Sequence, residues 1–312
     1  MKKNDKIYIA GHTGMLGSAL QQQLINRGFD NIITASRQEI DLTVQGEVRN
    51  FLTRQKPDYV FICAAKVGGI SANMNYPVDF LYDNLEMELN LINGSFLSGV
   101  KKLLFFGSAC AYPADAKQPV KEDALLHGRP EVTNEAYAVA KIAGIKLCQA
   151  YCNQYQKNFI SAIPTNAYGP GDDFDLETSH VIPAMIKKFH QAKVNKTPEV
   201  VIWGTGRPTR EFIYVDDWAE AAIFLMDNYN SAEPVNIGSG EEISIGRLAE
   251  IVKDITGFNG KIIFDRRKPD GIKRKALDST RINKLGWRAQ TRLLDGLKST
   301  YCWYLNNSDH LK

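Results

Sequence analysis

The sequence predicts an α/β fold, a doubly wound parallel sheet with a smaller α/β lobe. Three observations support this. Apolar strand-like segments alternate with helical segments through the first half of the chain. A glycine-rich turn separates the first strand from the first helix. The alternation weakens after residue 166, and 312 residues exceed what one core usually organises, so we expect a second lobe.

The first half of the chain defines the main sheet and its covering helices. We expect strands near residues 6–11, 31–35, 58–63, 102–106 and 159–163, with helices near 15–28, 44–54, 77–98 and 134–156. Strands that are apolar on both faces, with helices between them, are typical of a parallel sheet covered on both sides.

The second half is less regular. Residues 169–173 read as a loop, 180–192 as a helix and 199–203 as a strand. We expect an extended segment from Phe212, followed by a helix that Asp216 or Asp217 could cap. Residues 235–238 are expected to form a further strand of the main sheet. The predicted domains are therefore 1–166 with about 212–240, and 167–211 with 241–312.

Composition and charge exclude several function classes. The 38 basic and 35 acidic residues leave a net charge of +3, too small to favour nucleic acid or a membrane as partner. No apolar run approaches the roughly 18 residues that span a bilayer, and the first strand begins too early to leave room for a signal peptide. Five cysteines without metal-like spacing favour the cytoplasm and no metal site; Cys148 and Cys152 share a helical turn, which we interpret as burial.

The first turn has the spacing of a phosphate-binding loop. Gly11, Gly14 and Gly17 follow a strand and open a helix, where backbone N–H groups can approach a pyrophosphate at the helix N-terminus. His12, Thr13, Met15 and Leu16 complete the turn. A purely structural turn is the alternative, but the strand–turn–helix context favours a dinucleotide.

The end of the second strand distinguishes between the two nicotinamide dinucleotides. NAD is usually held there by an acidic residue on the ribose 2′-hydroxyl. This chain has Ser36 and Arg37 instead, and a guanidinium suits a 2′-phosphate. We therefore predict NADP(H). Two observations leave an alternative open: Glu39 lies only two residues further on, and Arg37 could be a solvated surface charge.

A possible proton donor lies on the helix expected at 134–156. Tyr137 and Lys141 are four residues apart and share a helix face. A free tyrosine has a pKa of about 10, and an adjacent ammonium would lower it. Ser108 follows the strand that ends at Gly107, at the sheet edge where such folds bind ligands, and could hydrogen-bond a carbonyl. Alone, the Tyr–Lys spacing is that of an ordinary amphipathic helix.

Together these motifs resemble the extended short-chain dehydrogenase/reductases and, more narrowly, the GDP-L-fucose synthase family. The resemblance covers nearly the whole chain and rests on residues 11–15, 64–70, 107–113, 140–148, 164–170, 179–184, 210–212 and 268–271. It implies further cofactor contacts from Asp41, Leu42, Ala64, Ala65, Lys66, Phe106, Gly107, Lys141, Pro164, Thr165, Asn166, Ala167 and His180.

The resemblance also implies two proton-transfer residues, Cys110 and His180. A ketone at C4 of a sugar acidifies the C–H bonds at C3 and C5, and a thiol and an imidazole titrate near enough to neutrality to exchange those protons. Without the resemblance, Cys110 would read as a small buried residue and His180 as a polar group at a helix start. A cleft for a nucleotide diphosphate is implied at Lys188, Trp203, Arg210, Asp270 and Lys275.

The resemblance implies an NADPH-dependent enzyme that epimerises GDP-4-keto-6-deoxy-D-mannose at C3 and C5 and then reduces C4. The alternatives are a relative acting on another GDP-4-keto sugar (a 3,6-dideoxy-hexose or a heptose), one that only reduces, or a non-catalytic NADP-binding sensor. Retention of both Cys110 and His180 argues against reduction alone.

The helices expected at 77–98 and 134–156 are apolar nearly all round. A helix that covers one sheet needs only an apolar stripe, so the surplus predicts a homodimer through these helices. Burial within one chain is the alternative.

Overall fold

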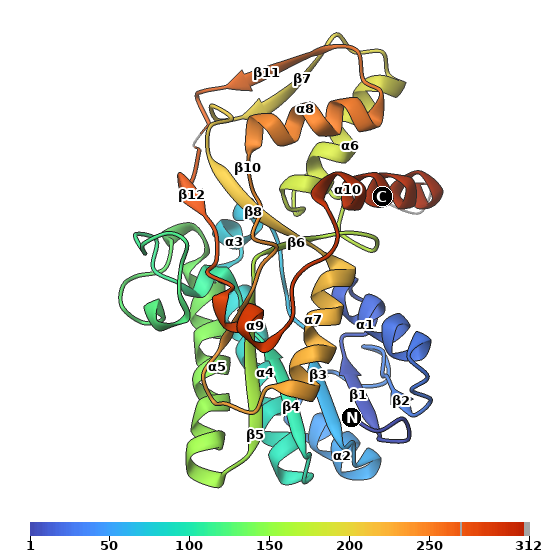
Figure 1. Ribbon diagram of the computed structural model, residues 1–312, viewed down its shortest axis with the longest axis vertical. Coiled ribbons are helices and arrows are strands. Elements are labelled where there is room, and N and C mark those ends of the chain that lie inside the picture. Colours follow the sequence, from blue (N-terminus) through green and yellow to red (C-terminus); the bar gives the residue numbers. More distant parts are fainter. Residues whose placement is uncertain (269, 309–312) are drawn as a thin grey trace.

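A computed structural model describes residues 1–268 and 270–308. Pro269, within the motif 268–271, and residues 309–312 lie outside the described residues. The chain forms a large lobe around a parallel sheet and a smaller lobe that carries the C-terminal helix (Figure 1).

The large sheet has six parallel strands in the order β2-β1-β3-β4-β5-β9. They are β1 (Ile7–Ala10), β2 (Ile32–Ile33), β3 (Tyr59–Ile62), β4 (Lys102–Phe106), β5 (Asn158–Pro164) and β9 (Val235–Ile237). This confirms the predicted doubly wound sheet. The strand order reverses between β1 and β3, and ligands of such sheets bind at the carboxyl ends of the strands near that point.

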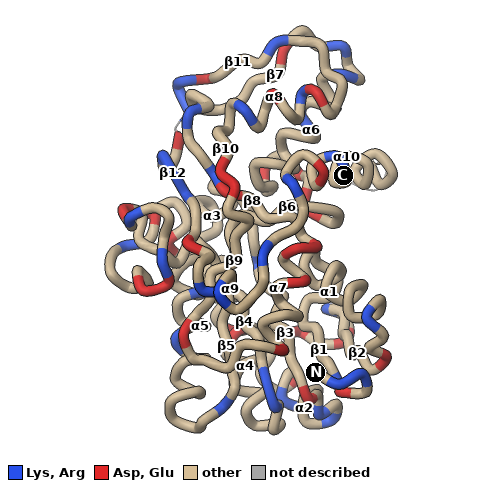
Figure 2. The backbone as a smooth tube through the Cα atoms, viewed as in Figure 1, with Lys and Arg blue, Asp and Glu red and all other residues tan. Residues whose placement is uncertain are grey.

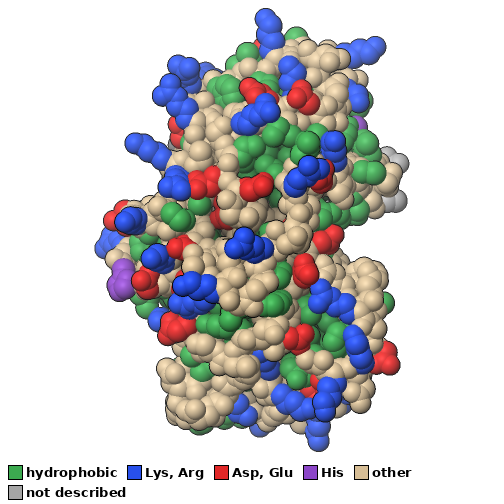
Figure 3. Space-filling view, in the orientation of Figure 1, with side chains coloured by type: hydrophobic (Ala, Val, Ile, Leu, Met, Phe, Trp, Pro, Cys, Tyr) green, Lys and Arg blue, Asp and Glu red, His purple; other side chains and the backbone are tan. Residues whose placement is uncertain are grey.

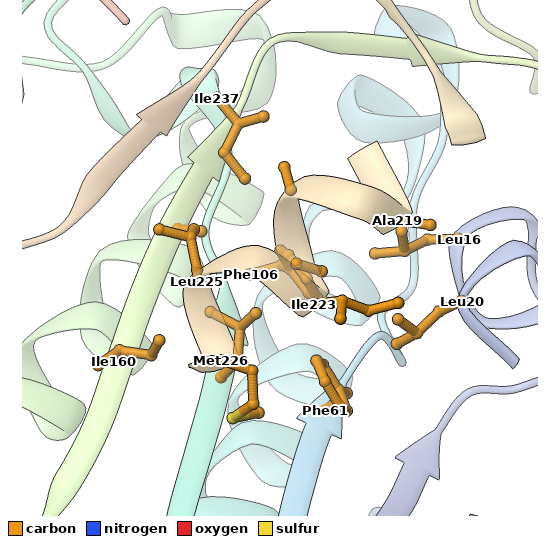
Figure 4. Packing of buried hydrophobic residues seen from close by; sticks show 14 of the residues in the cluster. Leu16, Leu20, Phe61, Phe106, Ile160, Ala219, Ile223, Leu225, Met226 and Ile237 are labelled. Carbon is orange, nitrogen blue, oxygen red and sulfur yellow. The ribbon is translucent and has the colours of Figure 1, made fainter. Parts of the chain in front are cut away.

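Helices cover both faces of this sheet. One face carries α1 (Met15–Asn26) and α7 (Val215–Asn228), and the other carries α2 (Gln45–Gln55), α4 (Pro77–Leu97) and α5 (Glu135–Tyr155). Successive residues of β1 point to opposite faces, since Ile7 and Ile9 belong to the first core and Tyr8 to the second. Figure 4 shows Ile223 and Met226 of α7 packed among side chains of α1 and the sheet.

The smaller lobe has its own apolar core, between α6 (Val181–Val194), α8 (Ile245–Thr256) and α10 (Leu293–Asn307). A parallel pair of strands, β7 (Glu199–Trp203) and β11 (Lys261–Asp265), lies at its far end (Figure 1). Nearer the large sheet, β8 (Thr209–Tyr214) pairs with β6 (Asn166–Tyr168), β10 (Glu242–Ser244) and β12 (Arg274–Lys275). Short helices α3 (Ile70–Asn75) and α9 (Thr280–Leu285) complete the fold.

The sequence prediction for the start of α7 was wrong in one detail. The helix begins at Val215 after Tyr214, and no side chain caps it. Asp217 is buried, and its carboxylate instead accepts hydrogen bonds from the backbone N–H groups of Gln290 and Thr291. The acidic side chain therefore joins α7 to a segment more than 70 residues away.

Charges of both signs are interspersed over both lobes (Figures 2 and 3). Within the described residues, every helix is too short or too polar to cross a bilayer.

Candidate active site

The glycine turn after β1 has the geometry that a pyrophosphate requires. Gly11 has a φ of +87°, and a Cβ there would lie 2.6 Å from the backbone nitrogen of Ala64. A Cβ on Gly17 would lie 2.1 Å from the carbonyl oxygen of Gly11. No side chain caps the start of α1, and its first turn holds no acidic residue. Free N–H groups and the positive end of the helix therefore remain for a phosphate, so these residues fit a bound dinucleotide.

The predicted 2′-phosphate position contains both the expected donors and a competing acid. The backbone N–H and the hydroxyl of Ser36 donate to the Glu39 carboxylate at 2.7 and 2.8 Å. These bonds hold the pKa of Glu39 below its usual range. Arg37 lies next to this pair in the chain. Glu39 thus occupies donors of Ser36 that a 2′-phosphate could use.

The other predicted cofactor residues lie at the carboxyl ends of the strands or in the loops that follow them. Leu42, Ala65, Phe106, Gly107, Pro164, Asn166 and Ala167 lie there by their positions after or at the ends of β2 to β6. Three others are engaged within the chain: Asp41 accepts hydrogen bonds from Thr43, Thr165 donates to the Glu211 carbonyl, and the Lys66 ammonium pairs with Asp79 and Asp83 of α4 at 2.9 and 2.8 Å.

Ser108, Tyr137 and Lys141 meet where β4 ends against α5. The Ser108 hydroxyl accepts from the backbone N–H of Cys110 at 3.2 Å, which fixes the short helical turn Ala109–Ala111. Ser108 also hydrogen-bonds the Tyr137 side chain. The structure therefore brings the predicted serine and tyrosine into contact.

The pKa of Tyr137, which we expected Lys141 to lower, is shifted in the opposite direction. The pKa of Tyr137 is raised, chiefly by burial and further by Cys110 and Glu88, while the hydrogen bond from Ser108 lowers it. The Lys141 ammonium lies 5.7 Å from the centroid of the Tyr137 ring but only 2.9 Å from the Glu88 carboxylate. Most of its field is therefore offset by a negative charge on α4.

Two polar side chains contact the Cys110 sulfur. The side-chain amide of Asn134 donates to its sulfur at 3.1 Å, and the Lys275 ammonium approaches the sulfur to 3.4 Å. Cys110 and Lys275 line one recess, together with Glu131.

His180 stands directly before α6 without capping it. The imidazole retains accessible surface, yet protein surrounds it closely enough that desolvation lowers its pKa. Lys275 lowers this pKa further and Asp173 opposes both effects. Lys275 thus contacts Cys110 and also affects the pKa of His180. A lowered pKa leaves His180 neutral at pH 7 and able to accept a proton.

The predicted substrate-binding residues lie in the smaller lobe. Trp203 is 57% exposed, with the ammonium groups of Lys188 and Lys268 5.8 and 4.9 Å from its ring centroid. Arg210 donates from one guanidinium nitrogen to the carbonyl oxygens of Thr209 and Ile272 at 2.8 and 2.6 Å. The flat indole with two flanking cations suits a base and its phosphates.

Asp270 is committed to the protein itself. Its carboxylate accepts hydrogen bonds from the backbone N–H and the hydroxyl of Thr205 at 2.6 and 2.7 Å. These bonds hold the pKa of Asp270 below its usual range. Asp270 therefore shapes the loop after Trp203.

Two site residues were missed from the sequence, Glu88 and Asn134. Glu88 gave no distinct signal, because the same helix carries three other acids and the sequence does not show which of them is buried. Asn134 gave no signal, since an amide before a helix usually reads as a cap. Here its side chain does not cap α5 and reaches Cys110 instead.

Comparison with known proteins identifies the family. The model of the NAD dependent epimerase/dehydratase family matches residues 7–238. GDP-L-fucose synthase 1 of Arabidopsis thaliana is 53% identical over 305 residues, covering 98% of this chain and 94% of that protein. This chain belongs to the GDP-L-fucose synthase family.

Solved structures of family relatives share the fold over their full length. A GDP-6-OMe-4-keto-L-xylo-heptose reductase from C. jejuni is 38% identical with a TM-score of 0.94, covering 98% of this chain and 99% of that one. A GDP-L-fucose synthetase from Naegleria fowleri bound to NADP is 30% identical with a TM-score of 0.92, covering 100% of this chain and 98% of that one.

Proposed function

We propose that this protein is an NADPH-dependent epimerase/reductase that converts GDP-4-keto-6-deoxy-D-mannose to GDP-L-fucose. The family relationship supports this function, as does the binding of NADP by a relative of the same fold. The observation that carries the proposal is the position of Lys275, which contacts Cys110 and acts electrostatically on His180, beside the Ser108–Tyr137 pair. A reductase alone would need only Ser108, Tyr137 and Lys141.

In the reduction, Tyr137 donates a proton to the C4 oxygen and Ser108 hydrogen-bonds that oxygen. NADPH, when bound, supplies the hydride. The raised pKa of Tyr137 keeps the phenol protonated, as a proton donor must be. The turn from Gly11 to Gly17 would hold the pyrophosphate, and Arg37 with Ser36 the 2′-phosphate.

In the epimerisation, Cys110 and His180 exchange protons at C3 and C5. The Lys275 ammonium and the Asn134 amide stabilise the sulfur when it is a thiolate. His180, neutral because its pKa is lowered, is available as the second proton-transfer group. Trp203, Lys188 and Arg210 would hold the nucleotide diphosphate in the smaller lobe, with Asp270 ordering the adjacent loop. The division into a cofactor-binding part and a substrate-binding part belongs to this proposal.

Two measurements test the function. Loss of NADPH absorbance with a panel of GDP-4-keto sugars, followed by NMR of the products, identifies the substrate. We expect turnover with the 6-deoxy-mannose derivative to give GDP-L-fucose. Turnover only with a heptose or a 3,6-dideoxy-hexose derivative would instead show that the protein acts on another GDP-4-keto sugar. The similarity to a heptose reductase suggests the first of these.

Solvent-deuterium incorporation tests the epimerisation separately. Cys110→Ser and His180→Asn are expected to lose incorporation at C3 and C5 but retain NADPH binding. Incorporation at the native rate in either variant would contradict the assigned roles.

We further propose that the protein is a cytoplasmic homodimer formed through α4 and α5. Apolar side chains on these helices are exposed, namely Val78, Tyr82, Leu89, Leu97, Val139 and Tyr155, so burial within one chain does not account for them. Leu89→Glu should dissociate the dimer in analytical ultracentrifugation. The matched control is Leu305→Glu on α10, equally exposed at 46% against 47%. A wild-type monomer at micromolar concentration would contradict the dimer.

A further inference from the structure

A buried ion pair lies beneath the proposed proton donor. Glu88 of α4 and Lys141 of α5 are joined at 2.9 Å between carboxylate oxygen and ammonium nitrogen, and their side chains are 2% and 4% exposed. Within the part of the chain that the structure describes, no donor other than Lys141 reaches this carboxylate. Tyr137 stands one turn before Lys141 on α5.

The fold makes room for this carboxylate. Gly144 lies one turn after Lys141, and a Cβ there would come within 2.7 Å of the Glu88 carboxylate and 2.4 Å of the Phe105 ring. The Lys141 ammonium lies 4.9 Å from the centroid of that same ring. A glycine is therefore required where α5 passes over the pair.

Stability does not account for the pair. Bringing two charges out of water costs several kcal/mol per ion, and well-packed apolar residues of similar volume are often at least as stable. Apolar residues would also suit the surroundings, since Leu91 and Ile92 of the same helix are fully buried. A functional reason for the acid is therefore needed.

The electrostatics at Tyr137 supply that reason. A lone ammonium near a phenol favours the phenolate, whereas a carboxylate against that ammonium cancels most of its field. The other groups facing the phenol are Ser108, which hydrogen-bonds it, and Cys110, whose charge would disfavour the phenolate. The titratable neighbours facing the pair are the Cys63 and Cys148 thiols, and burial raises the pKa of both, so they add no charge near neutrality. Burial raises the pKa of Glu88 and Lys141 opposes this effect, so the ammonium 2.9 Å away holds the charge on the carboxylate. Glu88 is thus the group that offsets Lys141.

We infer that Glu88 is a positioning residue that neutralises Lys141, so that Tyr137 keeps its proton and acts as an acid. The inference rests on the proposed function, because reduction of a ketone needs a proton donor and oxidation of an alcohol needs a base. By keeping Tyr137 protonated, Glu88 makes the Tyr–Lys pair suitable for reduction of a ketone.

The test is a titration of the tyrosines by ultraviolet absorbance at the phenolate band, on protein without cofactor or substrate. Glu88→Gln removes the charge and preserves the shape. We expect Tyr137 of the variant to ionise at least about one pH unit lower than Tyr137 of the wild type, because the neighbouring ammonium is then uncompensated. The shifted ionisation must be absent from the titration of the double variant Glu88→Gln/Tyr137→Phe. It must return to high pH in Glu88→Gln/Lys141→Met, which removes the uncompensated charge.

Kinetics provide a second readout. The basic limb of the pH profile of kcat/KM for the reduction should move down with the phenol in Glu88→Gln, while the acidic limb stays in place. Glu88→Asp keeps a charge but withdraws it from the ammonium, so a smaller shift is expected. This variant keeps the inference testable if the glutamine variant does not fold.

The inference is overturned if the folded variants titrate like the wild type. A uniform loss of activity with an unmoved pH profile would likewise show a merely structural role for Glu88. Because the absorbance titration needs no sugar, it distinguishes failure of this inference from failure of the proposed function.

Discussion

Replacement of Gly17 by alanine is the most direct test of the glycine turn. The added Cβ would lie 2.1 Å from the Gly11 carbonyl oxygen and 2.8 Å from the Cα of His12. Ordinary contacts begin at 3.4 Å, so the first contact is short by about 1.3 Å. The obstacles are backbone atoms of the turn, which cannot rotate away as a side chain could. The substitution must therefore move α1 away from the turn.

The magnitude follows from that displacement. Overpacking against a rigid neighbour typically costs about 1–3 kcal/mol, and a clash with the backbone of two consecutive residues puts Gly17→Ala near ~3 kcal/mol. At ~2 °C per kcal/mol for a large chain, Tm should fall by about 5 °C or more. Moving the helix by over 1 Å would also weaken the hydrogen bonds that its N–H groups would donate to a bound phosphate. Loss of about two such bonds at ~1.5 kcal/mol each would raise the Kd for NADPH by roughly 100-fold.

Calorimetry and titration of NADPH measure these two effects, and two glycines serve as controls. A Cβ on Gly14 meets only the Gly11 carbonyl oxygen at 3.5 Å, so Gly14→Ala should fold as stably as the wild type. Gly46 in α2 has nothing within 4 Å of its Cβ position, and Gly46→Ala should gain up to ~1 kcal/mol. If Gly17→Ala matched Gly14→Ala in Tm and bound NADPH like the wild type, the steric reasoning would be wrong.

Three further predictions concern the ribose site, the thiol and a buried lysine. Arg37→Ala should reduce the preference for NADPH over NADH by ~10-fold or more, and Glu39→Gln should increase it by removing the negative charge that holds the donors of Ser36, both measured as ratios of kcat/KM. An unchanged ratio in Arg37→Ala would refute the assignment of the 2′-phosphate site. Lys275→Met should slow solvent-deuterium incorporation by ~10-fold or more without weakening NADPH binding, because the ammonium beside the Cys110 sulfur is lost; native exchange in this variant would remove Lys275 from the epimerisation. Burial lowers the pKa of Lys102 to about 8 from 10.5, so between these values the unfolded chain binds more protons and the free energy of unfolding should rise with pH relative to Lys102→Met. If the free energies of unfolding of the two proteins, measured in urea, changed in parallel between pH 8 and 10.5, the predicted rise would be wrong.

Elements that depend on local patterns could be predicted from the sequence. The short apolar strand segments and the helical patterns of the first half predicted β1, β3, β4 and β5 and the helices between them, because each pattern is set by neighbours along the chain. The turn from Gly11 to Gly17 was recognisable for the same reason. Tyr137 and Lys141 were found because four residues make about one helical turn.

Helix α4 marks the limit of such reasoning. Its apolar composition was evident, but its orientation was not. In the structure Asn84, Glu88 and Asn90 are buried, while Leu89 and Leu97 are exposed. Polar residues turned inward and apolar residues turned outward cannot be inferred from a helix that is apolar nearly all round, because its pattern does not select a face.

The fold class, the nucleotide turn and the residue types available for proton transfer follow from the order of the amino acids alone, because they depend on spacing along the chain. Which charges act on which groups became clear from the folded arrangement. It placed Lys275 against Cys110 across 165 residues, and Glu88 against Lys141, and it reversed the expected direction of the Tyr137 pKa. Desolvation depends on burial and Coulomb interactions depend on distance in space, and the order of the residues specifies neither burial nor distance.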